Sequence, residues 1–240
     1  MEILRYVEEP RPCSYLPDQV AALDYRYFDK LEAAEFELLL HRGWRRFGFV
    51  LFRPACANCG RCQGIRVDVT RFQPTKSQRR ALARNRHIRV QWHPVEASQA
   101  HVDLYNAWHA NMHALKGWPE SAVTRSEYEY AYVAGRPEFA YEGRYFDGDR
   151  LVGIGLVDWL PGSLSSVYFY HDPAWRPLAP GVFSVLQEIE FCRTHSLPYL
   201  YLGNWLAEYP SMAYKDRYGP HELLQGRPAD AEPNLWLPPH

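Results

Sequence analysis

The chain has 240 residues, of which 47% are apolar and 23% charged, and its formal net charge is −1. Such a composition excludes a wholly disordered or collagen-like protein, and the length fits one large domain or two modest ones. No apolar run approaches the roughly 18 residues that a membrane-spanning helix needs, and the start MEILRYVEEP lacks the basic and apolar regions of a secretion signal. We therefore expect a cytoplasmic protein without a membrane partner.

The first 86 residues are predicted to form a small N-terminal region. Residues 29–41 have the spacing of an amphipathic helix, and residues 44–54 read as one strand closed by a proline. The following ACANCGRCQG is too rich in small residues for regular structure, so its cysteines lie on a loop. A strand over 65–72 has the alternation typical of a sheet edge, and residues 74–85 form a helix capped by Thr75 or Ser77.

Positive charge is concentrated in this region. Residues 41–90 contain 13 Lys or Arg and a single acid, Asp68, an excess of 12 positive charges. The density is highest around the helix over 74–85. Nucleic-acid backbone is the natural partner for such a stretch, with a solvated helical face as the alternative. The candidate phosphate contacts are Lys76, Arg84, Arg86 and Arg89.

The second half has a different organisation. A strand over 87–93 precedes helices over 97–116 and 124–133, three meandering strands, a helix around 182–192 and a last strand. This order is similar to the GNAT acyltransferase fold, in which the fourth and fifth strands separate to form the acyl-transfer cleft. We thus expect an α/β (α+β) protein with a GNAT-like acyltransferase domain over 87–225, preceded by a smaller cysteine-containing domain over 1–86 and followed by a loosely held tail over 226–240.

Several motifs occur together along the chain: CSYLP, RPACANCGRCQGIRV, SQRRALARN, VDWLPGSLSSVYFYHDP, FSVLQEIE, YLYLGNW and MAYK. With them the chain resembles the aminoacyl-tRNA-protein transferases, specifically the bacterial leucyl branch, over nearly its whole length. Asn204, Ser211 and the loop before the helix over 182–192 depart from the family pattern. The resemblance implies an enzyme that transfers leucine from leucyl-tRNA to proteins beginning with Asp or Glu and so creates a degradation signal of the N-end rule pathway.

Other classes remain open at this point. An arginyl-tRNA-protein transferase would use the same acceptors. A CoA-dependent N-acetyltransferase would share the fold, but the loop RPLAPG over 176–181 has two prolines where a CoA cradle offers backbone amides. A FemX-like transferase would aminoacylate a peptidoglycan precursor. A nucleic-acid-binding protein with a zinc knuckle would leave the acyltransferase-like half unexplained.

An aminoacyl ester is already activated toward amines, so the site must position a neutral α-amine and stabilise an oxyanion. Arginine or lysine should bind the acidic side chain of the acceptor, and the candidates are Arg79, Arg80 and Lys215. The alternatives are tRNA phosphate contacts for Arg79 and Arg80 and a surface position for Lys215. Asp158 interrupts an apolar strand, which suggests an ion-pair partner first and a catalytic base second. A second catalytic candidate is Tyr168. Three aromatic residues could stack on the terminal adenosine or enclose the aminoacyl group: Tyr168, Tyr170 and Trp205.

Four cysteines could share a metal. Cys56, Cys59 and Cys62 have the spacing that lets one loop offer several sulfur atoms, and Cys13 would complete the set, so zinc and an iron–sulfur cluster both fit. Free thiols that pack two loops together are the alternative. The transfer chemistry itself requires no cofactor.

Overall fold

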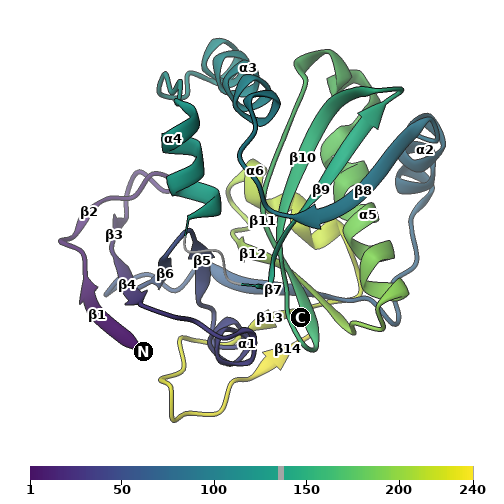
Figure 1. Cartoon of the computed structure of the whole chain (residues 1–240). Helices are drawn as coiled ribbons and strands as arrows, with labels where there is room; N and C mark the ends of the chain where they lie inside the picture. The colour runs from purple at the N-terminus through teal and green to yellow at the C-terminus, as the bar shows by residue number, and fades with distance from the viewer. Residues whose placement is uncertain (135–137, 240) are drawn as a thin grey trace.

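A computed structural model describes residues 1–134 and 138–239. An eight-stranded sheet occupies the centre of the molecule (Figure 1), and only its pair β11–β12 is parallel. In spatial order its strands are β14 (Trp236–Leu237), β13 (His221–Leu224), β7 (Gln63–Asp68), β12 (Tyr199–Trp205), β11 (Ser163–His171), β10 (Arg150–Trp159), β9 (Ala140–Asp147) and β8 (Ile88–Pro94).

Helices cover both faces of this sheet (Figure 1). On one face lie α5 (Pro180–Thr194) and, beside it, α2 (Lys76–Arg84); on the other lie α3 (Gln99–Lys116), α4 (Arg125–Tyr128) and the π-helical turn η1 (Glu129–Val133). The predicted helices and the order strand, helix, helix, three strands, helix, strand are confirmed. The cap of α2 is confirmed too, because Thr75 Oγ1 accepts from the Gln78 amide while Gln78 Oε1 accepts from the Thr75 amide.

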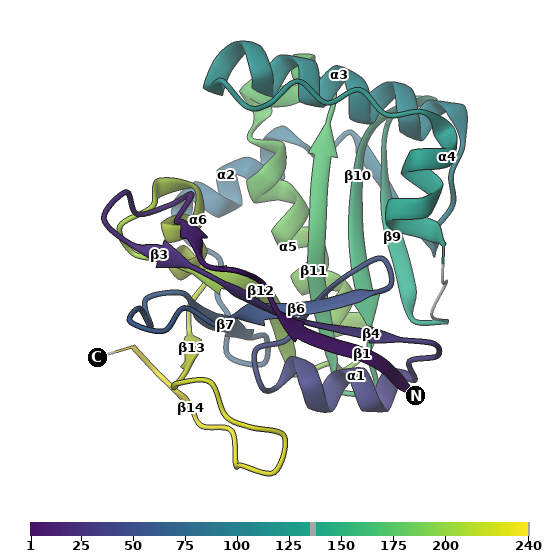
Figure 2. The ribbon, with the colours of Figure 1, turned by 90° about the vertical axis from the view of Figure 1, so that its left-hand side faces the viewer.

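A second, four-stranded antiparallel sheet is built from the first 54 residues. Its order is β1 (Glu2–Val7), β4 (Leu23–Phe28), β6 (Val50–Pro54) and β5 (Arg45–Phe47), and α1 (Ala33–Leu40) packs with it. Figure 2 shows this small sheet crossing in front of the lower ends of the large-sheet strands. The single strand predicted over 44–54 is wrong: Gly48, with a φ of +58°, turns the chain into the hairpin β5–β6.

The boundary expected at residue 86 does not separate the two sheets. Strand β7 lies inside the large sheet, between β12 and β13, so the prediction of an edge strand is wrong. Its residues Ile65 and Val67 are buried in the core beneath α5. The N-terminal region therefore ends, as a structural unit, before the cysteine loop.

The C-terminal segment is held more firmly than predicted. Within the described part of 226–240, β14 pairs with β13, and Trp236 is buried against Tyr201. The Trp236 indole donates to the His41 carbonyl oxygen at 3.0 Å. The expectation of a loose tail is wrong because one large aromatic side chain closes the core next to α1.

Strands β11 and β12 pair over three residues and then separate. Ser163, Leu164 and Ser165 pair with Tyr199 to Tyr201, after which the parallel pairing ends. On β12 the register shifts next to Gly203, whose φ is +86°. We call the opening between the free part of β11, from Ser166 onward, and the end of β12 the fork. No helix among the described residues is long and apolar enough to cross a membrane.

If Trp236 closes the core, Trp236→Ala should lower the free energy of unfolding by about 3 kcal/mol, since it deletes a buried indole and leaves a cavity. Urea unfolding followed by circular dichroism measures this change. Trp118→Ala, which removes an exposed indole, should change it by about 0.5 kcal/mol or less. Equal effects of the two substitutions would show that the C-terminal segment contributes no packing.

Candidate active site

The fork is entered by a side chain from the small sheet. Arg45, on β5, donates from Nη2 to the Ser166 carbonyl oxygen at 2.5 Å. Its guanidinium lies flat on Gly203, where an added Cβ would come within 3.4 to 3.5 Å of Nη2, Cζ and Nε. A Cβ at this position would thus be in contact with the cation, and the φ of +86° is the reason why glycine is favoured at residue 203.

A second cation reaches the same strand end. Lys215, on the short 3-10 helix η3 (Tyr214–Arg217) that follows α6 (Pro210–Ala213), donates to the Asn204 carbonyl oxygen at 2.5 Å. Burial, and next the charge of Arg45, lower the pKa of Lys215 to about 7. Lys215, a predicted acceptor-binding residue, thus lies at the fork.

A buried carboxyl group lies behind the fork. Glu188, on α5, accepts a hydrogen bond from Ser166 Oγ at 3.1 Å, and its Oε2 has no partner among the described residues. Burial raises the pKa of Glu188 to about 8, against the opposing effects of Ser166 and Arg45. At pH 7 this side chain is therefore mostly neutral.

A cavity of about 740 Å³ opens beside the fork, between α2, the N-terminal end of α5 and η3. Tyr214, next to Lys215, belongs to its wall, and three cations border it: Arg84, Arg176 and Arg217. Burial lowers the pKa of His171, another wall residue, to about 4, so its imidazole is neutral at pH 7. The cavity thus brings three cations together with Tyr214, the residue that precedes Lys215 in η3.

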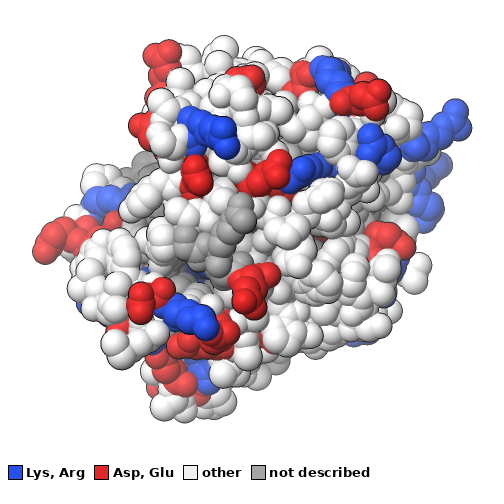
Figure 3. Space-filling model, viewed as in Figure 1, with Lys and Arg blue, Asp and Glu red and all other residues white. Residues whose placement is uncertain are grey.

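The cations of α2 and the strand after it face solvent. Arg79 and Arg80 are exposed, as are Lys76, Arg84, Arg86 and Arg89, and none of the six has an acidic side chain within 4.0 Å in the described part of the chain. Figure 3 shows Lys and Arg side chains along the edge where Figure 1 places α2. The helix turns its uncharged side, with Gln78 and Ala81, toward α5.

Two of the predicted site residues lie elsewhere. Asp158 is fully buried on β10 and forms an ion pair with Arg46, whose Nε lies 3.0 Å from Oδ1. Burial raises the pKa of Asp158, opposed by Arg46. This bears out the ion-pair role and leaves no path for a substrate. Tyr170 is also fully buried, with its hydroxyl 2.6 Å from that of Tyr128, so its predicted contact with tRNA is wrong.

Tyr168 and Trp205 are partly exposed. Tyr168 lies on the free part of β11, its hydroxyl 3.0 Å from His109 Nε2 and its ring stacked on Tyr132. Trp205 ends β12 and donates to the Ala213 carbonyl oxygen at 3.3 Å, which holds α6 and η3 against the sheet. These contacts do not assign a catalytic proton transfer to either side chain. The catalytic role of Tyr168 and the contacts of both residues with the terminal adenosine or the aminoacyl group stay predictions.

The four cysteines lie in one neighbourhood, on the loops after β2 (Arg11–Pro12) and β6, and their location between two strands is confirmed for 56–62. Burial raises the pKa of Cys62 to about 11, with smaller contributions from the other three thiols. Arg227 donates to the carbonyl oxygens of Cys56 and Cys59. The described residues bring no three of these sulfur atoms within 4.8 Å of one another, so a zinc or iron–sulfur site stays a prediction.

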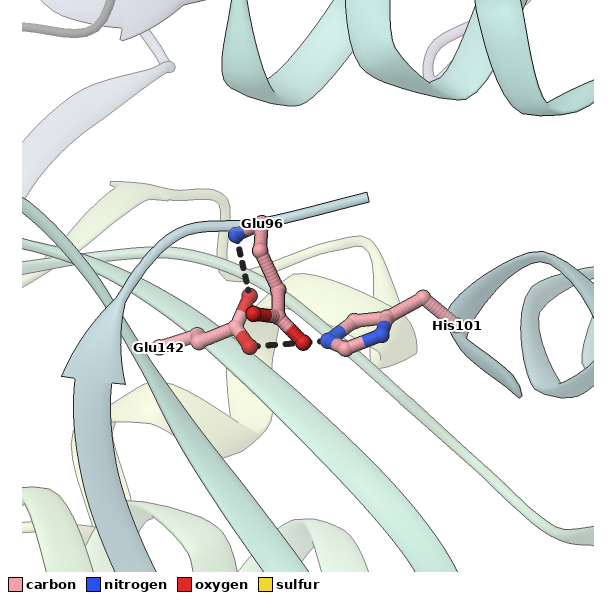
Figure 4. Close-up of side chains that lie close together, drawn as sticks. All are labelled: Glu96, His101 and Glu142. Atoms are coloured by element: carbon pink, nitrogen blue, oxygen red, sulfur yellow. Dashed lines mark hydrogen bonds and ion pairs between the residues drawn. The ribbon is translucent and has the colours of Figure 1, made fainter. Parts of the chain in front are cut away.

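A different set of potential ligands occurs beneath α3, where Glu96, His101 and Glu142 converge (Figure 4). His101 Nε2 lies 2.8 Å from Glu142 Oε1. Arg144 donates to the same oxygen at 2.6 Å and lies 3.1 Å from Glu96 Oε1. Arg144 is paired with both carboxylates and His101 with Glu142, so the cluster is an ion-pair and hydrogen-bond network that joins β9 to α3.

Sequence reasoning missed Arg45 and Glu188. Arg45 is one of 13 cations in residues 41–90, and only the contact between the two sheets distinguishes it. Glu188 could have been found from the sequence, because it lies between the apolar positions Val185 and Ile189 on one face of the predicted helix, where a carboxyl group is expected to be paired or functional. No feature of the sequence distinguishes Arg176 and Arg217, because only the tertiary fold brings them next to α2.

Comparisons with known proteins agree along the whole chain. Residues 11–80 match the family described as arginine-tRNA-protein transferase, N terminus, and residues 100–225 match its C terminus. The aspartate/glutamate leucyltransferase of Helicobacter hepaticus is 33% identical and covers 98% of both chains. That of Nitrosococcus oceani is 34% identical and covers 92% of this chain and 93% of its own.

Among solved structures, the C-terminal domain of a putative lysylphosphatidylglycerol synthetase from Agrobacterium fabrum matches with a TM-score of 0.44 and 12% identity, covering 60% of this chain and 46% of that one. The corresponding structure from Bacillus licheniformis matches with a TM-score of 0.42 and 11% identity, covering 75% and 52%.

Asp158→Asn should lower the free energy of unfolding by about 3 to 5 kcal/mol, because it leaves the buried Arg46 without its counter-charge. Glu32→Gln, which removes a partner from the exposed pair with Lys30, should cost about 0.5 kcal/mol or less. Urea unfolding measures both. If Asp158→Asn instead abolished catalysis at unchanged stability, Asp158 would be a catalytic base and the structural assignment would be wrong.

Proposed function

Because the chain belongs to the aminoacyl-tRNA-protein transferase family, we propose that it transfers leucine from leucyl-tRNA to the α-amino group of proteins that begin with Asp or Glu. The observation that carries this proposal is the match to aspartate/glutamate leucyltransferases over 98% of both chains. The product begins with leucine, which marks the protein for degradation by the N-end rule pathway.

The exposed cations of α2 and β8 would bind the tRNA. Lys76, Arg79, Arg80 and Arg84 lie at helical spacing on the outward face of α2, and the described residues give them no acidic partner. Unpaired cations on one face are suited to the repeated phosphates of a nucleic acid, whose counterions they displace. We therefore include Arg79 and Arg80, first predicted to contact the acceptor, in the tRNA surface.

The cavity beside α2 would receive the 3′ end of the tRNA. It is bordered by Arg84 and Arg217, cations suited to the terminal phosphates, and its wall includes Tyr214, the residue before Lys215. Pro177 and Pro180 reduce the number of free amides where α5 begins, which fits a donor whose phosphates lie outside the acyl cleft.

The reaction at the fork needs positioning more than acid–base chemistry. The α-amino nitrogen attacks the ester carbonyl carbon, the carbon–nitrogen bond forms, the bond to the ribose oxygen breaks, and that oxygen takes the proton that the amine loses. An α-amino group of pKa about 8 is mostly protonated at pH 7, and neighbouring positive charge lowers that pKa. Arg45 and Lys215 would thus favour the reactive neutral amine.

Arginine is the second candidate for the transferred amino acid, because both matched family descriptions name arginine-tRNA-protein transferase. The same site geometry serves either donor. The relatives that cover the whole chain are leucyltransferases, which favours leucine.

Transfer of labelled leucine, and separately of arginine, from charged tRNA to peptides beginning with Asp, Glu, Arg or Ala tests this function. We expect leucine on the Asp and Glu peptides alone. Acetyl-CoA is the control donor and should yield no product. Acetyl transfer, or tRNA binding without any transfer, would contradict the proposal; arginine transfer would keep the mechanism and change the donor.

The tRNA surface predicts a salt effect. The double variant Arg79→Gln/Arg80→Gln should bind tRNA more weakly, and the slope of log K against log salt concentration should become shallower by about 2, one unit for each lost phosphate contact. Lys30→Gln/Arg125→Gln removes two exposed cations elsewhere and should leave the slope unchanged. Fluorescence anisotropy at 50 to 200 mM salt measures this; equal slopes for both variants would place the tRNA elsewhere.

A further inference from the structure

Arg45 differs from three other arginines of the two sheets, Arg46, Arg53 and Arg66. Arg46 is paired with Asp158, Arg53 lies 3.6 Å from Asp24, and Arg66 is paired with Glu222. Arg45 has no carboxylate within 4.0 Å in the described part of the chain. One of its donors is bonded to the Ser166 carbonyl oxygen, which leaves the rest of the guanidinium free for another acceptor.

Lys215 places a second positive charge beside it. Arg45 lies on Gly203 and Lys215 donates to the next residue, Asn204, so both cations are held at the same strand end. The charge of Arg45 is one reason why the pKa of Lys215 is lowered. Two like charges held together in a partly buried place oppose each other unless an anion binds between them.

The described residues do not supply that anion. Glu188 is the acidic group behind the fork, but it is fully buried, bonded to Ser166 Oγ, and mostly neutral at pH 7. The other carboxylate near Arg45, that of Asp158, is occupied by Arg46. The fork is therefore a cationic site whose counter-ion comes from outside.

We propose that Arg45, with Lys215 beside it, binds the side-chain carboxylate of the N-terminal Asp or Glu of the acceptor protein. This inference rests on the proposed function. A guanidinium binds a carboxylate through two parallel hydrogen bonds. The Glu side chain is one methylene longer than that of Asp, and the flexible side chain of Lys215 can adjust to the different position of the carboxylate.

The geometry also fits the reaction. In the acceptor the carboxylate and the reacting α-amine belong to the same residue, so the group that binds the carboxylate must lie beside the acyl carbon. Arg45 lies in the fork, whereas Arg79 and Arg80 lie on the solvent face of α2. Arg45 therefore takes the role in specificity that sequence analysis assigned to those two.

The test is a selectivity ratio measured within each enzyme preparation. kcat/KM for leucine transfer is compared between peptides that begin with Asp and with Asn, which differ in charge but hardly in shape. Arg45→Gln should lower the Asp-to-Asn ratio about 30-fold, through loss on the Asp peptide, because a charge-assisted hydrogen bond is lost. Arg45→Lys keeps the charge without the paired donors and should lower the ratio less.

Controls separate this role from others. Arg79→Gln should lower kcat/KM on both peptides equally and keep the ratio, since it acts through tRNA, and Arg125→Gln should change neither. If Arg45→Gln lowered both activities with an unchanged ratio, Arg45 would only hold the fork together and the inference would fail. A wild-type enzyme without leucine transfer would instead overturn the proposed function.

Wild-type protein offers an independent readout should the variants fold poorly. Phenylglyoxal modifies accessible arginines, and mass spectrometry of the digest locates them. An Asp peptide should protect Arg45 several-fold better than an Asn peptide, with Arg79 unaffected by either. Equal protection by both peptides would contradict the inference.

Discussion

The buried ion pair between Arg46 and Asp158 is the contact on which the site depends. It joins β5 of the small sheet to β10 of the large one, and both partners are almost wholly buried. Because successive side chains of a strand point to opposite faces, an Arg46 fixed on β10 directs Arg45 the other way, into the fork. The cost of burying two charges is offset only when both are present, so the pair sets the register between the sheets as well as contributing stability.

The positively charged side chains form two groups that differ in burial and arrangement. The cations of α2 are exposed, follow one another at helical spacing and face solvent, as contacts to a repeating polyanion require. Arg45 and Lys215 are partly buried, converge on one strand end and suit a single carboxylate. The 740 Å³ cavity lies between α2 and η3, the helix that carries Lys215. We propose that a donor held on α2 extends its acyl end from this cavity toward an acceptor held at the fork. The net charge of −1 hides this division.

Local signals in the sequence predicted local structure well. The cap of α2, the helix around 182–192 and the three consecutive strands β9, β10 and β11 depend on neighbouring residues, and the structure confirms them. The turn at Gly48, which divides the strand predicted over 44–54, is a local failure. The other failures concern contacts between distant residues. The residues around β7 do not indicate that it lies between β12 and β13. The residues around Trp236 do not show that its side chain covers β7. Arg45 is distinguished from its basic neighbours only by the contact between β5 and β11. For Tyr170 the error is of another kind: the prediction gave this aromatic residue a contact with tRNA, but its side chain is buried in the core.

A crystal structure with a bound peptide that begins with Asp tests the central claim most directly. We predict that the Asp side-chain carboxylate lies within hydrogen-bonding distance of the Arg45 guanidinium, with the peptide α-amine in the fork beside Ser166. A carboxylate bound instead at Arg79 or Arg80, on the outer face of α2, would contradict this account and return acceptor recognition to the helix that we assign to tRNA.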